Sequence, residues 1–98
     1  AAVIMLTNVM AKEWGQHNIR VNAIAPGIIK TRLSEQLWKD PEVNKAAVAK
    51  VPLLRLGEPE ELGGVVVFLA SDAGSYVTGE TIVVDGGVLH GEPAHPEK

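Results

Sequence analysis

Residues 20–31 of the sequence read Arg20-Val21-Asn22-Ala23-Ile24-Ala25-Pro26-Gly27-Ile28-Ile29-Lys30-Thr31. The first half is an almost continuous apolar run, which is typical of a strand buried on both faces of an α/β sheet. Pro26 has a fixed φ and no amide hydrogen, so we expect the strand to stop before it and the chain to leave the sheet. The sequence therefore predicts a loop at the carboxyl end of a buried strand, where such sheets bind ligands.

The loop after this strand combines a glycine with main-chain groups that are free to pair. Gly27 has no Cβ, which permits unusual backbone angles and lets a flat ligand approach the main chain closely. The peptide groups of Ile28 and Ile29 and the hydroxyl of Thr31 can pair with a planar polar group. Pro-Gly is also common in ordinary turns, and residues 20–31 by themselves favour that simpler interpretation.

Three motifs in register favour the ligand loop. Residues 20–31 contain N-x-x-x-P-G-x-x-x-T, residues 55–62 read RLGEPEEL, and residues 68–72 and 75–87 read FLASD and SYVTGETIVVDGG. Together they resemble the short-chain dehydrogenase/reductase family, and within it the 3-oxoacyl-acyl-carrier-protein reductases. The resemblance implies an α/β fold in which residues 1–87 are the C-terminal part of a Rossmann-type doubly wound parallel sheet. The expected order is helix, strand, lid helices, helix, strand, followed by a flexible tail at 88–98.

The resemblance also implies an oxidoreductase that transfers a hydride between NAD or NADP and an alcohol or carbonyl substrate. In this family the loop after the strand holds the nicotinamide carboxamide, here through the main chain of Pro26, Gly27 and Ile29 and the hydroxyl of Thr31. The insertion at 33–50 is the family's substrate lid, with apolar side chains from Leu33, Leu37 and Trp38. It is predicted as two short helices separated near Asp40-Pro41, and a helical hairpin packed on its own domain explains it equally well. Neither the substrate nor the choice between NAD and NADP is indicated.

The serine, tyrosine and lysine that perform the family's chemistry are not found in this chain. Tyr76 is the only tyrosine, and the lysine that should follow four residues later is replaced by Glu80. Ala1 begins inside a helical pattern with no capping residue before it. The resemblance places the lysine directly before Ala1 and the tyrosine four residues earlier, so we expect a piece of a longer chain that is inactive alone. A non-catalytic truncated or accessory protein and a small nucleotide-binding module are the alternatives.

The two longest expected helices carry broad apolar surfaces. Residues 1–15 form one helix, which Gly15 and the polar Gln16-His17-Asn18 should end, and its apolar stripe is Val3, Leu6, Val9, Met10 and Trp14. In the last helix Pro59 should lie in the first turn, with Leu62, Val65, Val66 and Leu69 facing the core. Gly63 and Gly64 inside it predict close backbone packing, because glycine otherwise weakens a helix. Such surfaces favour a homo-oligomer, either a dimer or a tetramer.

Composition excludes several other classes of protein. The 98 residues make one small domain at most, and a net charge of −3 with scattered basic residues argues against nucleic-acid binding. The longest apolar run, residues 62–70, is too short to cross a membrane. The chain has no cysteine, which favours a cytoplasmic location, and His17, His90 and His95 lack the companions of a metal site. Lys12 and Lys30 are expected to be solvated charges, and Asp85 is expected to organise a turn.

Overall fold

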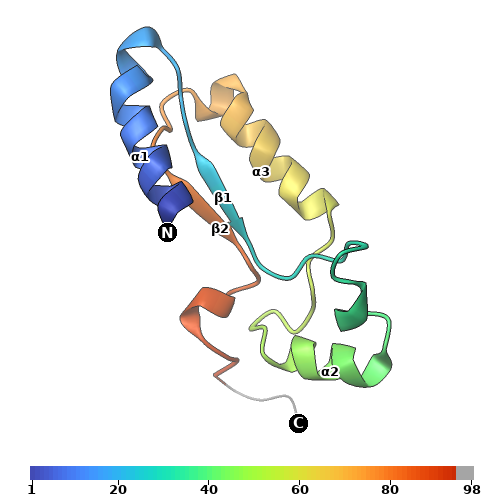
Figure 1. Ribbon diagram of the computed structural model, residues 1–98. Helices are drawn as coiled ribbons and strands as arrows, with labels where there is room; N and C mark the ends of the chain where they lie inside the picture. The colour runs from blue at the N-terminus through green and yellow to red at the C-terminus, as the bar shows by residue number, and fades with distance from the viewer. Residues whose placement is uncertain (95–98) are drawn as a thin grey trace. The chain divides into compact units, whose positions relative to one another are not determined.

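A computed structural model describes residues 1–94, and its helices and strands are drawn in Figure 1. The elements follow in the order α1 (Ala2–Trp14), β1 (Ala23–Pro26), α2 (Pro41–Ala49), α3 (Glu60–Ala70) and β2 (Thr81–Val84). Short 3-10 turns occur at Gly15–His17, Glu35–Leu37, Asp72–Gly74 and Val88–His90. The predicted order of helix, strand, lid helices, helix and strand is confirmed. The expected flexible tail at 88–98 lies partly outside the described residues, because these end at 94.

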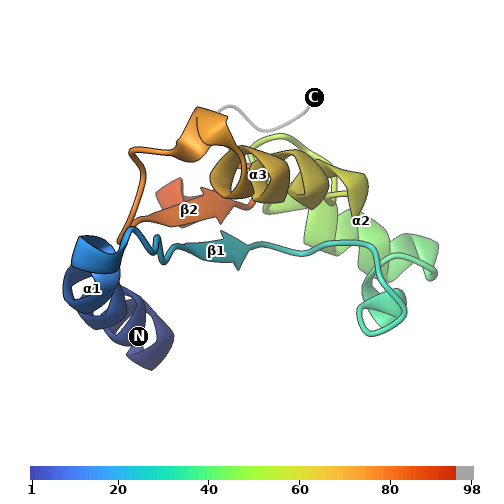
Figure 2. The same ribbon diagram turned by 90° about the horizontal axis from the view of Figure 1, so that it is seen from above.

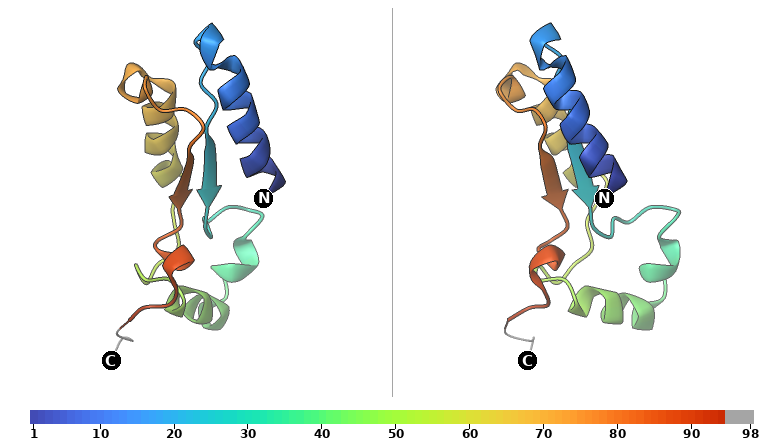
Figure 3. Two further views of the ribbon diagram at one scale, coloured as in Figure 1. Left: turned by 90° about the vertical axis from the view of Figure 1, so that its left-hand side faces the viewer. Right: turned by 60° about the vertical axis from the view of Figure 1, so that its left-hand side comes forward.

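The chain divides into two compact units. The first consists of residues 1–25 and 63–83, and the second of residues 26–62 together with the chain from residue 84 onward. Within the first unit, Figures 2 and 3 show α1 and α3 on opposite faces of the strand pair. This is the arrangement expected where helices cover both faces of a parallel sheet.

The two strands are parallel and directly paired. The amide of Ala23 donates to the Glu80 carbonyl at 2.8 Å, and the amide of Gly27 donates to the Val84 carbonyl at 2.9 Å. β1 includes Pro26, so the expectation that the strand stops before the proline is wrong. Peptide groups alternate sides along a strand, so the amide that Pro26 lacks would face away from β2 and its absence removes no bond of this ladder. β2 covers residues 81–84, which form the β-branched run Thr81-Ile82-Val83-Val84 that is typical of a strand.

The buried side of α1 is formed by small side chains rather than by the apolar stripe. Thr7 and Ala11 are buried, and the Thr7 hydroxyl donates to the Val3 carbonyl at 2.7 Å, which satisfies its polar atom. A Cβ on Gly79 would lie 3.4 Å from the Cβ of Ala11, so the chain approaches the helix closely at this point. Because small residues occupy the contact, most of the bulky stripe stays outside it. Val3, Leu6 and Val9 are each more than half exposed.

α1 ends at Trp14 with Gly15 as its C-cap, so the predicted end of the helix is confirmed. Gly15 is helical, with φ of −58°, and begins a 3-10 turn. The left-handed conformation is adopted by Asn18, with φ of 58°. Asparagine tolerates this region better than most residues with a side chain, so the glycine is not needed for the reversal.

α3 begins as predicted but packs differently along its length. The Glu61 carboxylate accepts the amide of Glu58 at 2.9 Å, which is half of a capping box, and Pro59 follows the capped residue. Leu62, Val65 and Leu69 are half-buried, whereas Val66 is 50% exposed. The expected close packing at Gly63 and Gly64 is not found within residues 1–94, since a Cβ on either would meet no atom within 4 Å.

The second unit contains α2 and a short buried segment after it. Asp40 caps α2 by accepting the amide of Glu42 at 2.9 Å, and Pro41 occupies the first turn, so the predicted boundary near Asp40-Pro41 is confirmed. Val51 and Leu56 are the buried hydrophobic residues of this unit. Across residues 1–94, no helix combines the length and the apolar character needed to cross a membrane.

Candidate functional site

The candidate site is the loop that leaves β1 at its carboxyl end. Gly27 needs to be a glycine because of Asp85, since a Cβ at position 27 would lie 2.8 Å from both the Cα and the Cβ of Asp85. Its φ is not in the left-handed region. The expectation that Gly27 is there for unusual backbone angles is therefore wrong. The close approach is to the chain's own backbone at the end of β2.

Ile29, the next predicted contact, forms an isolated parallel bridge with Gly57. The Gly57 amide donates to the Ile28 carbonyl at 3.0 Å, and the Lys30 amide donates to the Gly57 carbonyl at 2.9 Å. In such a bridge the central residue's own amide and carbonyl face away from the partner. Ile29 thus presents one donor and one acceptor together on the edge opposite Gly57.

Thr31 and Ser34 close the loop with a set of short hydrogen bonds. The Thr31 amide donates to the Ser34 hydroxyl at 2.9 Å, and the same hydroxyl donates to the Ile29 carbonyl. The Thr31 hydroxyl lies 3.3 Å from the Ser34 hydroxyl and accepts the Ser34 amide at 3.3 Å. Ser34 was not predicted from the sequence as a site residue. The T-x-x-S spacing, which favours a local side-chain-to-backbone turn, was the available signal.

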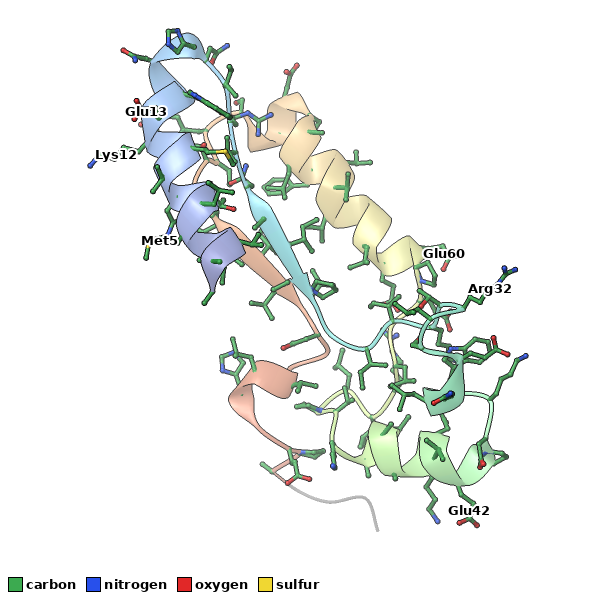
Figure 4. All side chains as sticks on the ribbon, viewed as in Figure 1. Met5, Lys12, Glu13, Arg32, Glu42 and Glu60 are labelled. Atoms are coloured by element: carbon green, nitrogen blue, oxygen red, sulfur yellow. The ribbon has the colours of Figure 1, made fainter. Side chains whose placement is uncertain are left out.

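The predicted lid residues lie in the segment that follows. Leu33 is almost fully exposed, whereas Leu37 and Trp38 are half-buried. The indole nitrogen of Trp38 donates to the Thr31 carbonyl at 3.1 Å. Trp38 is thus hydrogen-bonded to the candidate loop. Leu33 has almost no contact with the rest of residues 1–94. Figure 4 shows the neighbouring Arg32 side chain pointing outward from the loop.

An ion pair fixes the segment that carries Gly57. The Arg55 guanidinium donates to both carboxylate oxygens of Glu61, at 2.6 and 2.7 Å. The hydrogen bond from Arg55, helped by the amide of Glu58, lowers the pKa of Glu61 to about 2. Lys30 pairs with Glu58 at 3.4 Å and stays exposed to solvent, as expected for a solvated charge. Both residues are exposed, and such a pair contributes little.

Asp85 organises the end of β2, as predicted. Its carboxylate accepts the amides of Gly87 and Leu89 at 2.8 and 2.9 Å. These bonds support the 3-10 turn at Val88–His90. Both carboxylate oxygens of Asp85 accept hydrogen bonds within this turn, so we assign Asp85 a structural role and not that of a catalytic acid.

Two polar residues of the first unit have structural partners instead of a free surface. The Asn22 amide group donates to the Val77 carbonyl at 2.9 Å and accepts the Glu80 amide at 3.0 Å. The Arg20 guanidinium donates to the carbonyls of Leu69 and Gly74. Asn22, the first residue of the loop motif, therefore holds the approach to β2, and Arg20 secures the end of α3. This role of Arg20 was not predicted from the sequence.

No cluster of three potential metal-ligating side chains occurs in residues 1–94. Tyr76 is fully exposed. Glu80 stands four residues after it, where the resemblance requires a lysine. His95 lies outside the described residues.

The parallel strand pair between helices and the loop at its carboxyl end define an α/β protein of the Rossmann type. Residues 1–89 match the family model described as enoyl-(acyl carrier protein) reductase. The chain belongs to the short-chain dehydrogenase/reductase family, which confirms the resemblance in the sequence.

Similar proteins support this assignment along almost the whole chain. Dehydrogenase/reductase SDR family member 4 of Oryctolagus cuniculus is 49% identical over 86 residues, covering 88% of this chain and 33% of the relative. The 3-oxoacyl-[acyl-carrier-protein] reductase FabG of Thermotoga maritima is 50% identical over 90 residues, covering 91% and 35%. The Pseudomonas aeruginosa RhlG/NADP active-site complex has a TM-score of 0.84 and 39% identity, covering 89% of this chain and 35% of that one. The chain spans about a third of the length of these curated relatives.

Proposed function

We propose that this chain supplies the nicotinamide-positioning loop and the substrate lid of an NAD(P)-dependent oxidoreductase. The observation that carries the proposal is the edge of Ile29 that faces away from Gly57, where one amide and one carbonyl lie together. The carbonyl accepts the Ser34 hydroxyl and keeps a second lone pair for a ligand. A primary carboxamide offers the complementary pair, a carbonyl acceptor and an amide donor. A nicotinamide held in this way has a fixed ring orientation toward the substrate.

The other loop residues complete this role. The main chain at Pro26 and Gly27 forms the entry to the loop. The exposed Thr31 hydroxyl lies 3.3 Å from the Ser34 hydroxyl, which also donates to the Ile29 carbonyl. When bound, the nicotinamide exchanges a hydride with an alcohol or carbonyl carbon. The contribution of this chain is orientation, which is a large part of the reduction in barrier when two reacting carbons must meet. Leu33, Leu37 and Trp38 would then face the substrate, a small alcohol or carbonyl compound.

The proposal assigns no proton transfer to this chain. The family's serine, tyrosine and lysine would have to come from elsewhere in a complete enzyme, and the 98 residues alone are expected to be inactive. The alternatives, a non-catalytic truncated protein and a nucleotide-binding module without chemistry, predict the same inactivity for the isolated chain. The alternatives differ from the proposal because neither requires the loop to position a cofactor inside a complete enzyme.

We propose a homo-oligomer, a dimer or a tetramer, for the complete protein. Val3, Met5, Leu6 and Val9 give α1 a wide exposed apolar surface, and a second subunit would cover it. Figure 4 shows Met5, Lys12 and Glu13 of α1 pointing away from the strand pair.

The cytoplasm is the compartment that fits a chain with no cysteine.

A chimera tests the proposal directly. Residues 1–89 replace the corresponding C-terminal third of the Thermotoga maritima reductase, which is 50% identical over the matched region. We expect the folded chimera to bind NADH or NADPH with a dissociation constant within about tenfold of the parent reductase, measured by nicotinamide fluorescence. The isolated 98-residue chain should show no binding.

Two controls are needed to interpret cofactor binding by the chimera. The parent reductase sets the reference, and its upstream two thirds alone should not bind the reduced cofactor. A chimera that folds, by circular dichroism and a cooperative thermal transition, but binds neither NADH nor NADPH would overturn the proposed function. Low-micromolar binding of either cofactor by the isolated chain would favour the self-contained binding module.

A further inference from the structure

Gly57 makes two main-chain contacts with the candidate loop although it lies far from it in the sequence. Its amide donates to the Ile28 carbonyl and its carbonyl accepts the Lys30 amide, at 3.0 and 2.9 Å. These are the peptide groups on either side of Ile29. Gly57 therefore fixes both peptide planes that flank the residue proposed to hold the carboxamide.

This bridge decides which way the groups of Ile29 point. The groups of Ile28 and Lys30 that face Gly57 are used, so the amide and carbonyl of Ile29 are directed to the other edge. Were the bridge lost, rotation about the loop's φ and ψ angles would separate donor from acceptor. The paired arrangement on one edge thus depends on Gly57 as well as on Ile29.

The bridge favours glycine for a steric reason. A Cβ at position 57 would lie 2.6 Å from Cδ1 of Ile29 and 3.7 Å from the Ile28 carbonyl oxygen. The φ of Gly57 is not in the left-handed region, so conformational freedom does not explain the glycine. Cδ1 is the end of a flexible side chain and can move aside for a single methyl group. A branched side chain at 57 would have to push the whole of Ile29 away.

Gly57 is itself held on both sides. Leu56, the preceding residue, is buried at 3% exposure. On the other side, Glu58 is tied by its amide to the Glu61 carboxylate, which Arg55 holds with two hydrogen bonds. The segment 55–61 is therefore held in place on both sides of Gly57.

We propose that Gly57 is a positioning residue for the nicotinamide carboxamide, acting through the main chain of Ile29. This inference rests on the proposed function of the loop. Gly57 touches no cofactor atom. It sets the direction of the two peptide groups that do.

The test uses the chimera with Gly57→Val, the smaller change Gly57→Ala, and the double variant Gly57→Val with Ile29→Ala. Gly15→Val is the matched control, because a Cβ at Gly15 meets no atom within 4 Å and Gly15 lies outside the loop. Gly57→Val should weaken binding of the reduced cofactor about tenfold, the equivalent of one lost hydrogen bond. Gly57→Ala should have a smaller effect, and Ile29→Ala should recover most of the loss by making room for the valine.

The decisive readout compares the natural reduced cofactor with its reduced 3-acetylpyridine analogue, which keeps the carbonyl but has a methyl group in place of the amide nitrogen. The unsubstituted chimera should prefer the natural cofactor by about tenfold, because the analogue cannot donate to Ile29. Gly57→Val should reduce this preference toward one, the double variant should restore it, and Gly15→Val should leave it unchanged.

The outcomes separate the positioning role of Gly57 from the proposed function of the loop. If Gly57→Val, or Gly57→Ala should the valine variant not fold, weakens both cofactors equally and leaves the preference intact, Gly57 has only a structural role and the inference is wrong. It is also wrong if the unsubstituted chimera binds both cofactors equally well. If the unsubstituted chimera binds neither, the proposed function fails and this inference fails with it.

Discussion

Arg55 and Glu61 form a bidentate ion pair in which Nη1 and Nη2 donate to Oε1 and Oε2 at 2.6 and 2.7 Å. Oε1 also accepts the amide of Glu58, two residues before α3 begins. One carboxylate therefore serves both the start of a helix and the segment that supports the candidate loop. The hydrogen bond from Arg55 is the main reason that the pKa of Glu61 falls to about 2, and the same pair raises the pKa of Arg55.

Glu61→Gln should lower the thermal stability of the protein at neutral pH. The pKa of Glu61 is depressed in the folded state, so its contribution is complete above the ordinary value of 4.5 and is lost as the pH falls toward about 2. The gap in melting temperature between the wild type and Glu61→Gln should accordingly shrink across that interval. Circular dichroism melts from pH 7 down to pH 2 measure it.

Glu60→Gln is the matched control, because Glu60 lies in the same first turn of α3 and forms no ion pair within residues 1–94. It should reduce the melting temperature less at neutral pH. Equal effects of the two substitutions, with the same pH dependence, would show that proximity to the helix end matters and the pairing with Arg55 does not.

Gly27→Ala should destabilise the fold by about 1–3 kcal/mol, the range for an overpacked site. The added Cβ would lie 2.8 Å from the Cα of Asp85, and a backbone atom at the end of a strand cannot move aside cheaply. Gly15→Ala is the comparison, since its helical φ of −58° and open surroundings suit alanine. It should be neutral or stabilising by about 0.5–1 kcal/mol. Urea unfolding of both variants gives the difference, and a neutral Gly27→Ala would contradict the close contact with Asp85.

The features predicted correctly from the sequence are those set by neighbouring residues. The bounds of β2 follow from its β-branched run, the start of α2 follows from Asp40-Pro41, and the turn at Asp85 follows from two glycines after an aspartate. Each of these signals lies within a few positions of the element that it defines. The family motifs predicted the fold because each motif contains several of these local signals.

The features that were missed depend on residues far apart in the chain. The reason for glycine at position 27 is Asp85, and the partner of Lys30 is Glu58. The buried side of α1 is selected by the close approach of Gly79 to Ala11, which hydrophobic spacing alone does not reveal. Helical periodicity identifies an apolar face but not the contact that covers it.

Thr31→Val should weaken binding of the reduced cofactor in the chimera about tenfold, because the hydroxyl is lost while the shape is kept. Thr31→Ser, which keeps a hydroxyl, should bind nearly as well as the unsubstituted chimera. Ser34→Ala separates the two roles of the hydroxyl, since it removes the partner at 3.3 Å and leaves Thr31 in place. If Thr31→Val and Ser34→Ala have the same effect, the threonine serves the turn and its assignment to the nicotinamide fails.

Gly63→Ala and Gly64→Ala should each stabilise a monomer, and each should destabilise an oligomer in which this part of α3 contacts a second subunit. In a monomer, a Cβ at either position meets no atom within 4 Å, so each alanine should stabilise α3 by about 1 kcal/mol. If the proposed oligomer buries this part of α3, the backbone of a second subunit occupies that space, and alanine should then destabilise the assembly. Sedimentation velocity and thermal melts, run on the isolated chain and on the chimera, distinguish the cases. A gain in melting temperature in both, with no change in the oligomeric state, would exclude this surface of α3 from the subunit contact and leave α1 as the proposed interface.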